Sequence, residues 1–463
     1  MRLSPTVYSL LPVLILFITY TGYGQKNKAA EIDSMVKRAN KMGVFNGNVL
    51  VADRNKVIYR SSAGKADASG KTMLTTNYRF DIGSISKEFN GVGIMLLKEE
   101  GKLSLDDKVS KYLPELPAWA NKITILNLLQ YTSGLPNIKW KTIKSDADIM
   151  NDLKKLDTLQ FEPGTNYYYN NNNVFLQRQI IGRITGMPFN EFVKQRLLIP
   201  CKMDHSVIDP TYTDKLVARS FNNDGVQDSV VYTMTGWTAV TLDDFYKWEK
   251  ALETYRLISP AATRAILYPS APNRQSGLGG GGMNGDTIIR HKHDGTSYNY
   301  QALIISDPPK GRVVILLTNN KQNNLNEFDR AIQDILDGKP YTQPKKSPLT
   351  FFWNSLDTLR GGQLIDRYKE LSKTLNAEYG FDNESVLNSI GYFYLGKGRF
   401  EDAITVFEYN TKLFPSSGNV FDSLGEAYYK KGDKQNALLN YKRSLALDPG
   451  NTTAQRIIAE LSK

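Results

Sequence analysis

The 463-residue sequence has few of the residues that build disulfide frameworks and metal centres. Its single cysteine, Cys201, excludes a disulfide within the chain and a site with several cysteine ligands. Three histidines are too few for a histidine-rich metal centre. Acidic residues are the minority, 47 against 58 Lys and Arg, but the basic residues are scattered along the chain. This charge favours solubility or weak attraction to anionic surfaces, and no nucleic-acid partner is expected.

The N-terminus has the order of residues found in a secretory signal. Arg2 precedes an apolar run, residues 7–20, and the small residues of 21–24 follow it. The alternative, a membrane anchor, needs about 20 apolar residues, and this run is shorter. We therefore predict a signal peptide over residues 1–24 and a periplasmic or secreted protein, with no membrane span after cleavage. Retention of the segment as an anchor stays open.

The remaining chain has ordinary globular composition, with 41% hydrophobic residues, and a length typical of two or three domains. A hairpin is predicted over residues 45–62, and helical periodicity over 84–100 ends at Gly101. Further helices are predicted at 123–131, 174–185, 241–254 and 323–337, and strands at Thr287–His291, Tyr298–Ser306 and Arg312–Leu317. Strands from both ends around a helical middle predict an α+β domain over residues 25–340.

After a linker, predicted at 341–360, the chain contains a repeat. Four residues recur at a spacing of 34, as the pairs Gly391 and Gly425, Ala403 and Ala437, Phe407 and Tyr441, and Pro415 and Pro449. This pattern resembles the tetratricopeptide repeat. The resemblance implies an all-α domain over 361–463 with repeats at about 384–417 and 418–451. Such repeats bind protein partners, although a purely structural packing role stays open here.

Residues 84–87, Ser-Ile-Ser-Lys, could form a nucleophile and its base. A serine that attacks a carbonyl needs a base beside it, and residues three apart on a helix share a face. The same spacing occurs at Ser34–Lys37 and Ser62–Lys65, but only Ser84 opens an apolar helix. Lys87 would need burial to lower its pKa enough to act as a base.

Two further segments could complete such a site. The loop after Pro163-Gly164-Thr165 offers a phenol and an amide two residues apart, as Tyr168 with Asn170 or Tyr169 with Asn171. Near the end of a strand-like run, Gly295 would let a substrate backbone approach closely, and the N–H of Thr296 could serve an oxyanion hole. His291 and His293 share a face of this strand, but the sequence indicates no third ligand, so no metal site is expected.

The three segments together resemble the serine β-lactamase and penicillin-binding-protein superfamily, most closely its class C branch of esterases, D-aminopeptidases and D-stereospecific carboxypeptidases. That family runs Ser-x-x-Lys, Tyr-x-Asn and Lys/His-x-Gly, which here are Ser84–Lys87, Tyr169–Asn171 and His293–Gly295. Its Pro-Gly-Thr followed by three residues and a tyrosine favours Tyr169 over Tyr168. Residues 128–136 and 241–244 resemble further family segments.

This resemblance implies a three-layer α/β sandwich with a helical insertion. It also implies that Ser84 is the nucleophile, that Lys87 and Tyr169 share the base and acid roles, and that no metal or organic cofactor takes part. Asn171 and His293 would orient the substrate, while the N–H groups of Ser84 and Thr296 would bind the oxyanion beside Gly295.

The function expected from the resemblance is a secreted serine hydrolase that acts through an acyl-enzyme on small esters or D-amino-acid peptides. Two alternatives stay open, a true β-lactamase and a non-catalytic binding or sensor protein whose repeats recruit a partner. The family's lysine is replaced by His293, which argues against β-lactam hydrolysis, and the presence of Lys87 and Tyr169 argues against the sensor.

Overall fold

The computed structural model describes residues 27–211, 213–269, 274–321 and 325–462, which fall into two compact units that meet in sequence after Gln343. The predicted signal peptide lies outside these residues. Among the helices of the described residues, none is long and apolar enough to cross a membrane.

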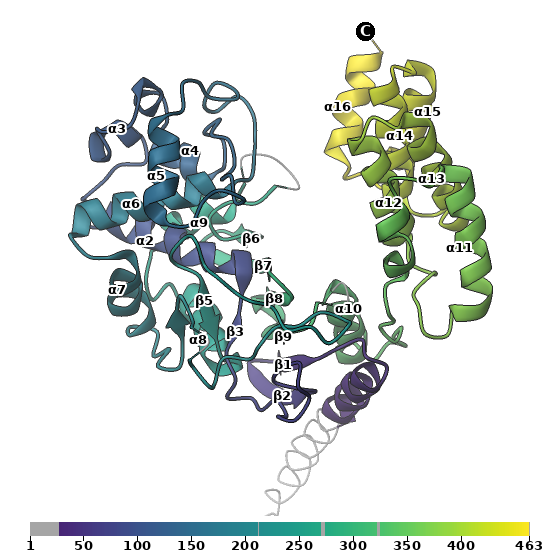
Figure 1. Ribbon diagram of the computed structural model, residues 1–463, viewed down its shortest axis with the longest axis horizontal. Helices are drawn as coiled ribbons and strands as arrows, with labels where there is room; N and C mark the ends of the chain where they lie inside the picture. Colours follow the sequence, from purple (N-terminus) through teal and green to yellow (C-terminus); the bar gives the residue numbers. More distant parts are fainter. Residues whose placement is uncertain (1–26, 212, 270–273, 322–324, 463) are drawn as a thin grey trace, which may run out of the picture. The chain divides into compact units, whose positions relative to one another are not determined.

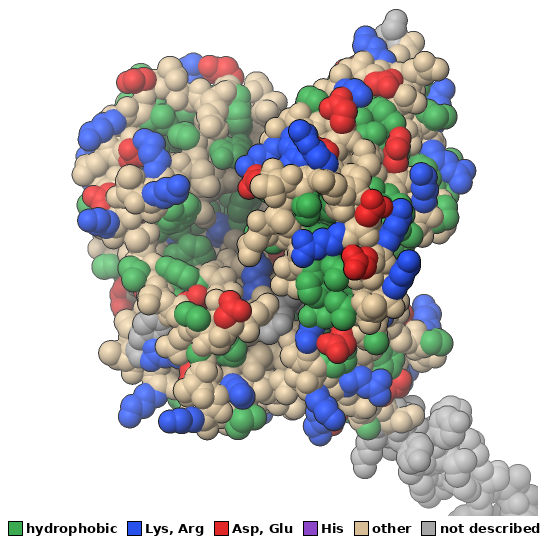
Figure 2. Space-filling model, turned by 45° about the vertical axis from the view of Figure 1, so that its right-hand side comes forward, with side chains coloured by type: hydrophobic (Ala, Val, Ile, Leu, Met, Phe, Trp, Pro, Cys, Tyr) green, Lys and Arg blue, Asp and Glu red, His purple; other side chains and the backbone are tan. Residues whose placement is uncertain are grey.

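Lys and Arg side chains are interspersed with Asp and Glu on the face in Figure 2, without forming one continuous stripe.

The larger unit contains a six-stranded antiparallel sheet with strands from both ends of its chain. The strands are β1 Gly47–Asp53, β2 Lys56–Ala63, β6 Gly280–Asn284, β7 Thr287–Ser297, β8 Tyr300–Asp307 and β9 Arg312–Thr318, in the order β2-β1-β9-β8-β7-β6. β1 and β2 form the predicted hairpin, in which the turn residues Arg54 and Asn55 both have positive φ. β1 also pairs with β9, so the start and the end of the unit meet in the middle of the sheet.

Helices cover both faces of this sheet (Figure 1). Along β8, Ala302 and Ile304 pack into a core with the helices α2, α8 and α9, whereas Leu303 and Ile305 pack with α10 and the helix over residues 27–41. These helices are α2 Lys87–Glu99, α8 Leu242–Glu253, α9 Pro260–Leu267 and α10 Leu325–Leu336. Alternation with a period of two is typical of a strand buried on both faces. The expected three-layer fold is therefore confirmed.

The middle of the chain forms the helical insertion and a small second sheet. The insertion comprises α3 Val109–Tyr112, α4 Ile125–Leu129, α5 Asp146–Lys154, α6 Asn171–Thr185 and α7 Phe189–Val193. The second sheet, in the order β3-β5-β4, consists of β3 Phe80–Asp81, β4 Val207–Ile208 and β5 Thr238–Val240. β3 leads directly into the segment that carries Ser84.

Two predicted boundaries need correction. The helix expected from residue 84 begins as a 3₁₀ turn, η1 Gly83–Ser86, and becomes α-helical only at Lys87. The strand expected to end at His291 continues to Ser297, so the His-x-Gly motif lies within β7 and not at its end. β6 was not predicted because three of its five residues are glycines, which favour neither strand nor helix.

The smaller unit is all helical, as predicted. Its α-helices are α11 Gly361–Leu375, α12 Glu384–Gly396, α13 Phe400–Leu413, α14 Gly418–Lys431, α15 Lys434–Leu447 and α16 Thr452–Leu461. A Cβ on Gly391 would lie 2.4 Å from the ring of Phe407, and a Cβ on Gly425 would lie 3.1 Å from the ring of Tyr441. The 34-residue spacing thus reproduces one glycine–aromatic contact between the two helices of each repeat.

Part of the predicted linker, 341–360, is folded. Phe352 and Leu356 are fully buried in the core of the smaller unit. The backbone of Lys346 hydrogen-bonds to Glu378 and Gly380 of the same unit. The connection between the two units is therefore shorter than expected. α11 then packs against the repeats through Leu364 and Tyr368.

These contacts predict how fragments of the chain should behave. A fragment ending at Gln343 keeps every candidate catalytic residue and should retain activity on small esters. A fragment of 344–463 should fold, but should lose most of its helicity when residues 361–374 are removed, because two repeats alone bury too little apolar surface. Ester assays and circular dichroism measure both outcomes. A soluble, monodisperse but inactive fragment ending at Gln343 would show that the repeats contribute to the active site.

Candidate active site

The side chains of Ser84 and Lys87 are in direct contact. Nζ of Lys87 donates a hydrogen bond to Oγ of Ser84 over 2.9 Å. The 3₁₀ turn η1 carries Ser84, and Lys87 is the first residue of α2. The three-residue spacing therefore places both groups on one side of this turn, as the sequence predicts. The other two Ser-x-x-Lys pairs differ, since Lys37 forms an ion pair with Asp33 and Ser62 lies on β2.

Lys87 is held in surroundings that favour its neutral form. Its side chain is buried, with Nζ 5.2 Å from the centre of the Tyr169 ring and 5.5 Å from that of the Trp237 ring. Burial, together with the nearby charge of Arg178, lowers the pKa of Lys87 to about 7, although the charge of Asp81 opposes the change. An amine with this pKa is partly deprotonated at neutral pH and can accept a proton from Ser84.

The ring of Tyr169 lies next to Lys87, whereas Tyr168 is 38% exposed. The Tyr169 hydroxyl is buried and makes no hydrogen bond to any described residue. Burial raises the pKa of Tyr169 to about 12, although the Ser84 side chain opposes this effect. The ring packs against Tyr131 with a centroid distance of 4.6 Å. The phenol therefore stays protonated at neutral pH and is available as a proton donor.

Asn171 is the first residue of α6, and Asn170 is its N-cap. The Asn170 side chain accepts from the N–H of Asn173 and donates to the carbonyl of Leu135 over 2.9 Å. Asn170 therefore caps the helix and anchors the preceding loop at once. The side-chain oxygen of Asn171 is buried and has no hydrogen-bond partner among the described residues.

Two glycines allow η1 and β7 to approach closely at the expected oxyanion site. A Cβ on Gly295 would lie 2.0 Å from the carbonyl oxygen of Ile82 and 2.9 Å from the backbone nitrogen of Ser84. Gly83 has φ of +55°, and a Cβ there would lie 2.5 Å from the nitrogen of Thr296. Any side chain at either position would push the segments apart. The backbone nitrogens of Ser84 and Thr296 are thus brought to the same place.

The surroundings of His293 were not predicted from the sequence. Its imidazole is 2% exposed, and Nδ1 lies 2.7 Å from Oε1 of Glu88. A Cβ on Gly279 would lie 2.5 Å from Cγ of His293, so the loop before β6 packs against the imidazole. His293 therefore belongs to a buried hydrogen-bond network under the site. The described residues contain no group of three or more His, Cys, Asp or Glu side chains placed to hold a metal ion.

Several groups around the site were not predicted. Asp81 is fully buried, accepts from the N–H of Gly83 over 2.7 Å and from the hydroxyl of Tyr232 over 2.6 Å, and so braces the turn that carries Ser84. Burial raises the pKa of Asp81. Arg178 on α6 is buried and donates to the carbonyl of Gly236 over 3.2 Å. The sequence does not indicate the contacts of Asp81 with Tyr232 and of Arg178 with Gly236, because the two residues of each pair are 151 and 58 positions apart in the chain.

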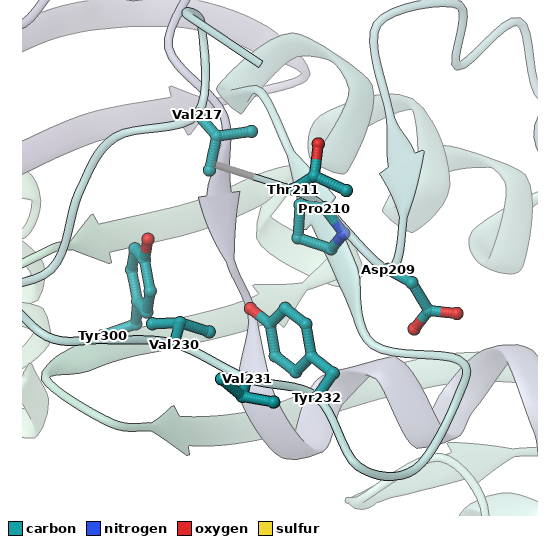
Figure 3. A pocket seen from close by; sticks show the side chains of 8 residues that line it. All are labelled: Asp209, Pro210, Thr211, Val217, Val230, Val231, Tyr232 and Tyr300. Carbon is teal, nitrogen blue, oxygen red and sulfur yellow. The ribbon is translucent and has the colours of Figure 1, made fainter. Parts of the chain in front are cut away.

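A cavity of about 320 Å³ lies near the turn that carries Ser84, because Tyr232, one of its lining residues, bonds to Asp81. Figure 3 shows the rings of Tyr232 and Tyr300 and the side chains of Val217, Val230 and Val231 around it. Tyr232 connects the cavity to the site, since its hydroxyl bonds to Asp81 and its ring stacks on Trp237 with a centroid distance of 6.1 Å.

The only cysteine, Cys201, is buried as expected, and burial raises the pKa of its thiol to about 11.

Comparison with known proteins places this site in a family. Residues 32–339 match the family model described as Beta-lactamase, and residues 419–451 match Tetratricopeptide repeat. Penicillin-binding protein 4* of Bacillus subtilis is 28% identical, over 86% of this chain and 92% of that protein. Protein flp of Staphylococcus aureus is 25% identical over 62% of each protein.

Solved structures share the fold. A class C β-lactamase superposes with a TM-score of 0.58 at 20% identity, covering 68% of this chain and 97% of that one. The D-amino acid amidase of Ochrobactrum anthropi superposes with a TM-score of 0.57 at 20% identity, covering 67% and 99%. The family model covers well over half of the sequence, and the paired serine and lysine lie within it. The chain therefore belongs to the β-lactamase family and carries a tetratricopeptide repeat after the family domain.

Proposed function

We propose that this protein is a secreted serine hydrolase that acts through an acyl-enzyme on small esters and amides, including D-amino-acid peptides. The observation that carries the proposal is the 2.9 Å bond between the buried amine of Lys87 and Oγ of Ser84. A buried lysine with a pKa of about 7 beside a serine is costly in stability and has no evident structural use. The predicted signal peptide supports export of the protein.

In the proposed mechanism, neutral Lys87 accepts the hydroxyl proton of Ser84 as Oγ attacks the substrate carbonyl carbon. The N–H groups of Ser84 and Thr296 bind the negative charge that develops on the carbonyl oxygen. The carbon–oxygen or carbon–nitrogen bond to the leaving group then breaks, and the proton reaches the leaving group through the Tyr169 hydroxyl. Water attacks the acyl-enzyme with Lys87 again as the base, which releases the acid and restores Ser84.

The proposal is tested by labelling the purified protein with a fluorophosphonate and mapping the modified peptide. We expect one label, on Ser84, together with hydrolysis of p-nitrophenyl acetate and of a D-amino-acid p-nitroanilide. Hydrolysis of only one of the two substrates would identify an esterase or an amidase. A protein that is folded, unlabelled and inactive on both would contradict the proposal and favour a binding role.

The charges under the site predict a preference for neutral substrates. Where many relatives present a lysine ammonium, this site has His293, and the carboxylate of Glu88 lies 2.7 Å behind it. The buried cluster contains the carboxylates of Glu88 and Glu249 with His291 between them, so one negative charge remains even when His291 is protonated, and this charge repels a carboxylate on the substrate. We expect the methyl ester of a chromogenic cephalosporin to be hydrolysed at least about tenfold faster than the free acid, a difference of about 1.4 kcal/mol. The kcat/KM values of the ester and the free acid test this preference. A higher kcat/KM for the free acid would refute it.

A further inference from the structure

Five side chains form a buried cluster between α2, α8 and β7. Oε1 of Glu88 lies 2.7 Å from Nδ1 of His293 and 3.1 Å from Nε2 of His291. Oε2 of Glu88 accepts from Nε1 of Trp248 over 2.6 Å, and Nδ1 of His291 lies 2.7 Å from Oε2 of Glu249. None of the five side chains is more than 2% exposed. Both oxygens of Glu88 are thus used by partners on other elements.

The protonation states within the cluster follow from these contacts. Both ring nitrogens of His291 face carboxylate oxygens, which suits an imidazolium with two donors. Burial alone would lower the pKa of His291, but the charges of Glu249 and Glu88 raise it well above its usual value. Burial alone would raise the pKa of Glu88, but His291 and His293 hold it well below its usual range. Glu88 is therefore an anion, and its Oε1 accepts a hydrogen bond from Nδ1 of His293.

The cluster joins the two segments that form the expected oxyanion hole. Glu88 follows Lys87 directly and lies four residues after Ser84 on the same turn and helix. His293 lies on β7, three residues before Thr296. At Gly83 and Gly295 the same two segments approach so closely that neither position has room for a Cβ. The Glu88–His293 bond is thus a polar link beside this contact, in a region where the glycines themselves provide no side-chain interaction.

We propose that Glu88 is a positioning residue of the active site, which acts through His293 to hold β7 at the distance from Ser84 that the two oxyanion N–H groups require. This inference rests on the proposed acyl-enzyme function. The donors of an oxyanion hole must lie about 2.7–3.1 Å from the charged oxygen, which forms only in the transition state. A displaced β7 should therefore lower kcat while KM changes little.

The test compares two substitutions that remove the same kind of group from the same cluster. Glu88→Gln removes the anion from His293, whereas the matched control Glu249→Gln removes an anion that contacts His291 but not His293. With p-nitrophenyl acetate, we expect Glu88→Gln to lower kcat by about 30- to 100-fold with KM within about threefold, as for a misplaced catalytic group. Glu249→Gln should lower the melting temperature but change kcat by less than about threefold.

A double-mutant cycle tests whether Glu88 acts through His293. His293→Asn combined with Glu88→Gln should lower kcat no further than the larger single effect, because both break one link. Glu88→Asp keeps the charge and should restore part of the lost kcat. If Glu88→Gln does not fold, Glu88→Asp and His293→Asn still test the positioning role, since both should lower kcat with KM unchanged.

The outcomes separate the inference from the function on which it rests. Wild-type protein labelled at Ser84, with equal losses of kcat in Glu88→Gln and Glu249→Gln, would overturn the positioning role alone. Additive effects in the cycle would also overturn it. Wild-type protein that takes no fluorophosphonate label would overturn both proposals.

Discussion

Replacing Ser84 by alanine should lower ester turnover by on the order of 10⁴-fold or more and abolish fluorophosphonate labelling. The reason is that the nucleophile and its base act as one unit, so removal of either leaves only the contribution of substrate binding and the oxyanion hole. The structure supports this choice of serine, because the Ser84 hydroxyl accepts a hydrogen bond from the buried amine of Lys87. Turnover of a p-nitrophenyl ester and mass mapping of the label measure both effects.

The chain supplies two matched controls for this substitution. Ser34 and Ser62 are each followed by a lysine three residues later, but Lys37 is 73% exposed and paired with Asp33, and Ser62 lies on a strand. Ser34→Ala and Ser62→Ala should therefore leave turnover and labelling unchanged. A label on either serine, with Ser84 unmodified, would show that the nucleophile is misassigned.

Much of the fold could be predicted because its signals are local. The Asp53–Asn55 turn with alternating apolar residues on both sides defined the first hairpin, and the glycine–aromatic pairs at a spacing of 34 defined the repeat. The boundaries that failed depend on contacts with other segments. β7 extends beyond His291 because β8 pairs with its polar second half, through residues such as Gly295 with Ala302. The residues of β7 after His291 are all polar or glycine, so they gave no apolar pattern that would predict this extension.

The site could be predicted where neighbouring residues carry the chemistry. The spacing of Ser84 and Lys87 indicates one shared helix face, and the structure brings the two groups into contact. The environment of Lys87 could not be predicted, because Trp237 and Arg178 come from other elements. The environment of His293 could not be predicted either, because its partner Glu88 is 205 residues away in the sequence. Its burial is therefore visible only after the chain has folded.

The substitution Lys87→Met should separate activity from stability. Methionine has a similar length but no amine, so turnover should fall by on the order of 10³- to 10⁴-fold because Ser84 loses its base. In the wild type, kcat/KM should rise with pH through about 7, as Lys87 loses its proton. The variant should lose this rise. The matched control is Lys37→Met, which changes an exposed lysine of the same Ser-x-x-Lys pattern and should keep both turnover and pH profile.

The same variant should be more stable than the wild type, and most so at low pH. The pKa of Lys87 in the folded protein, about 7, lies below the ordinary value of 10.5, so between these pH values the unfolded chain binds the proton that the folded protein has lost. The stability of the wild type should therefore increase relative to Lys87→Met by about 2–3 kcal/mol from pH 7 to pH 9, at about 1.4 kcal/mol for each pH unit. Chemical denaturation of both proteins at the two pH values measures this difference. Parallel pH dependences would mean that Lys87 keeps its proton in the folded protein, and the base would then have to be sought elsewhere.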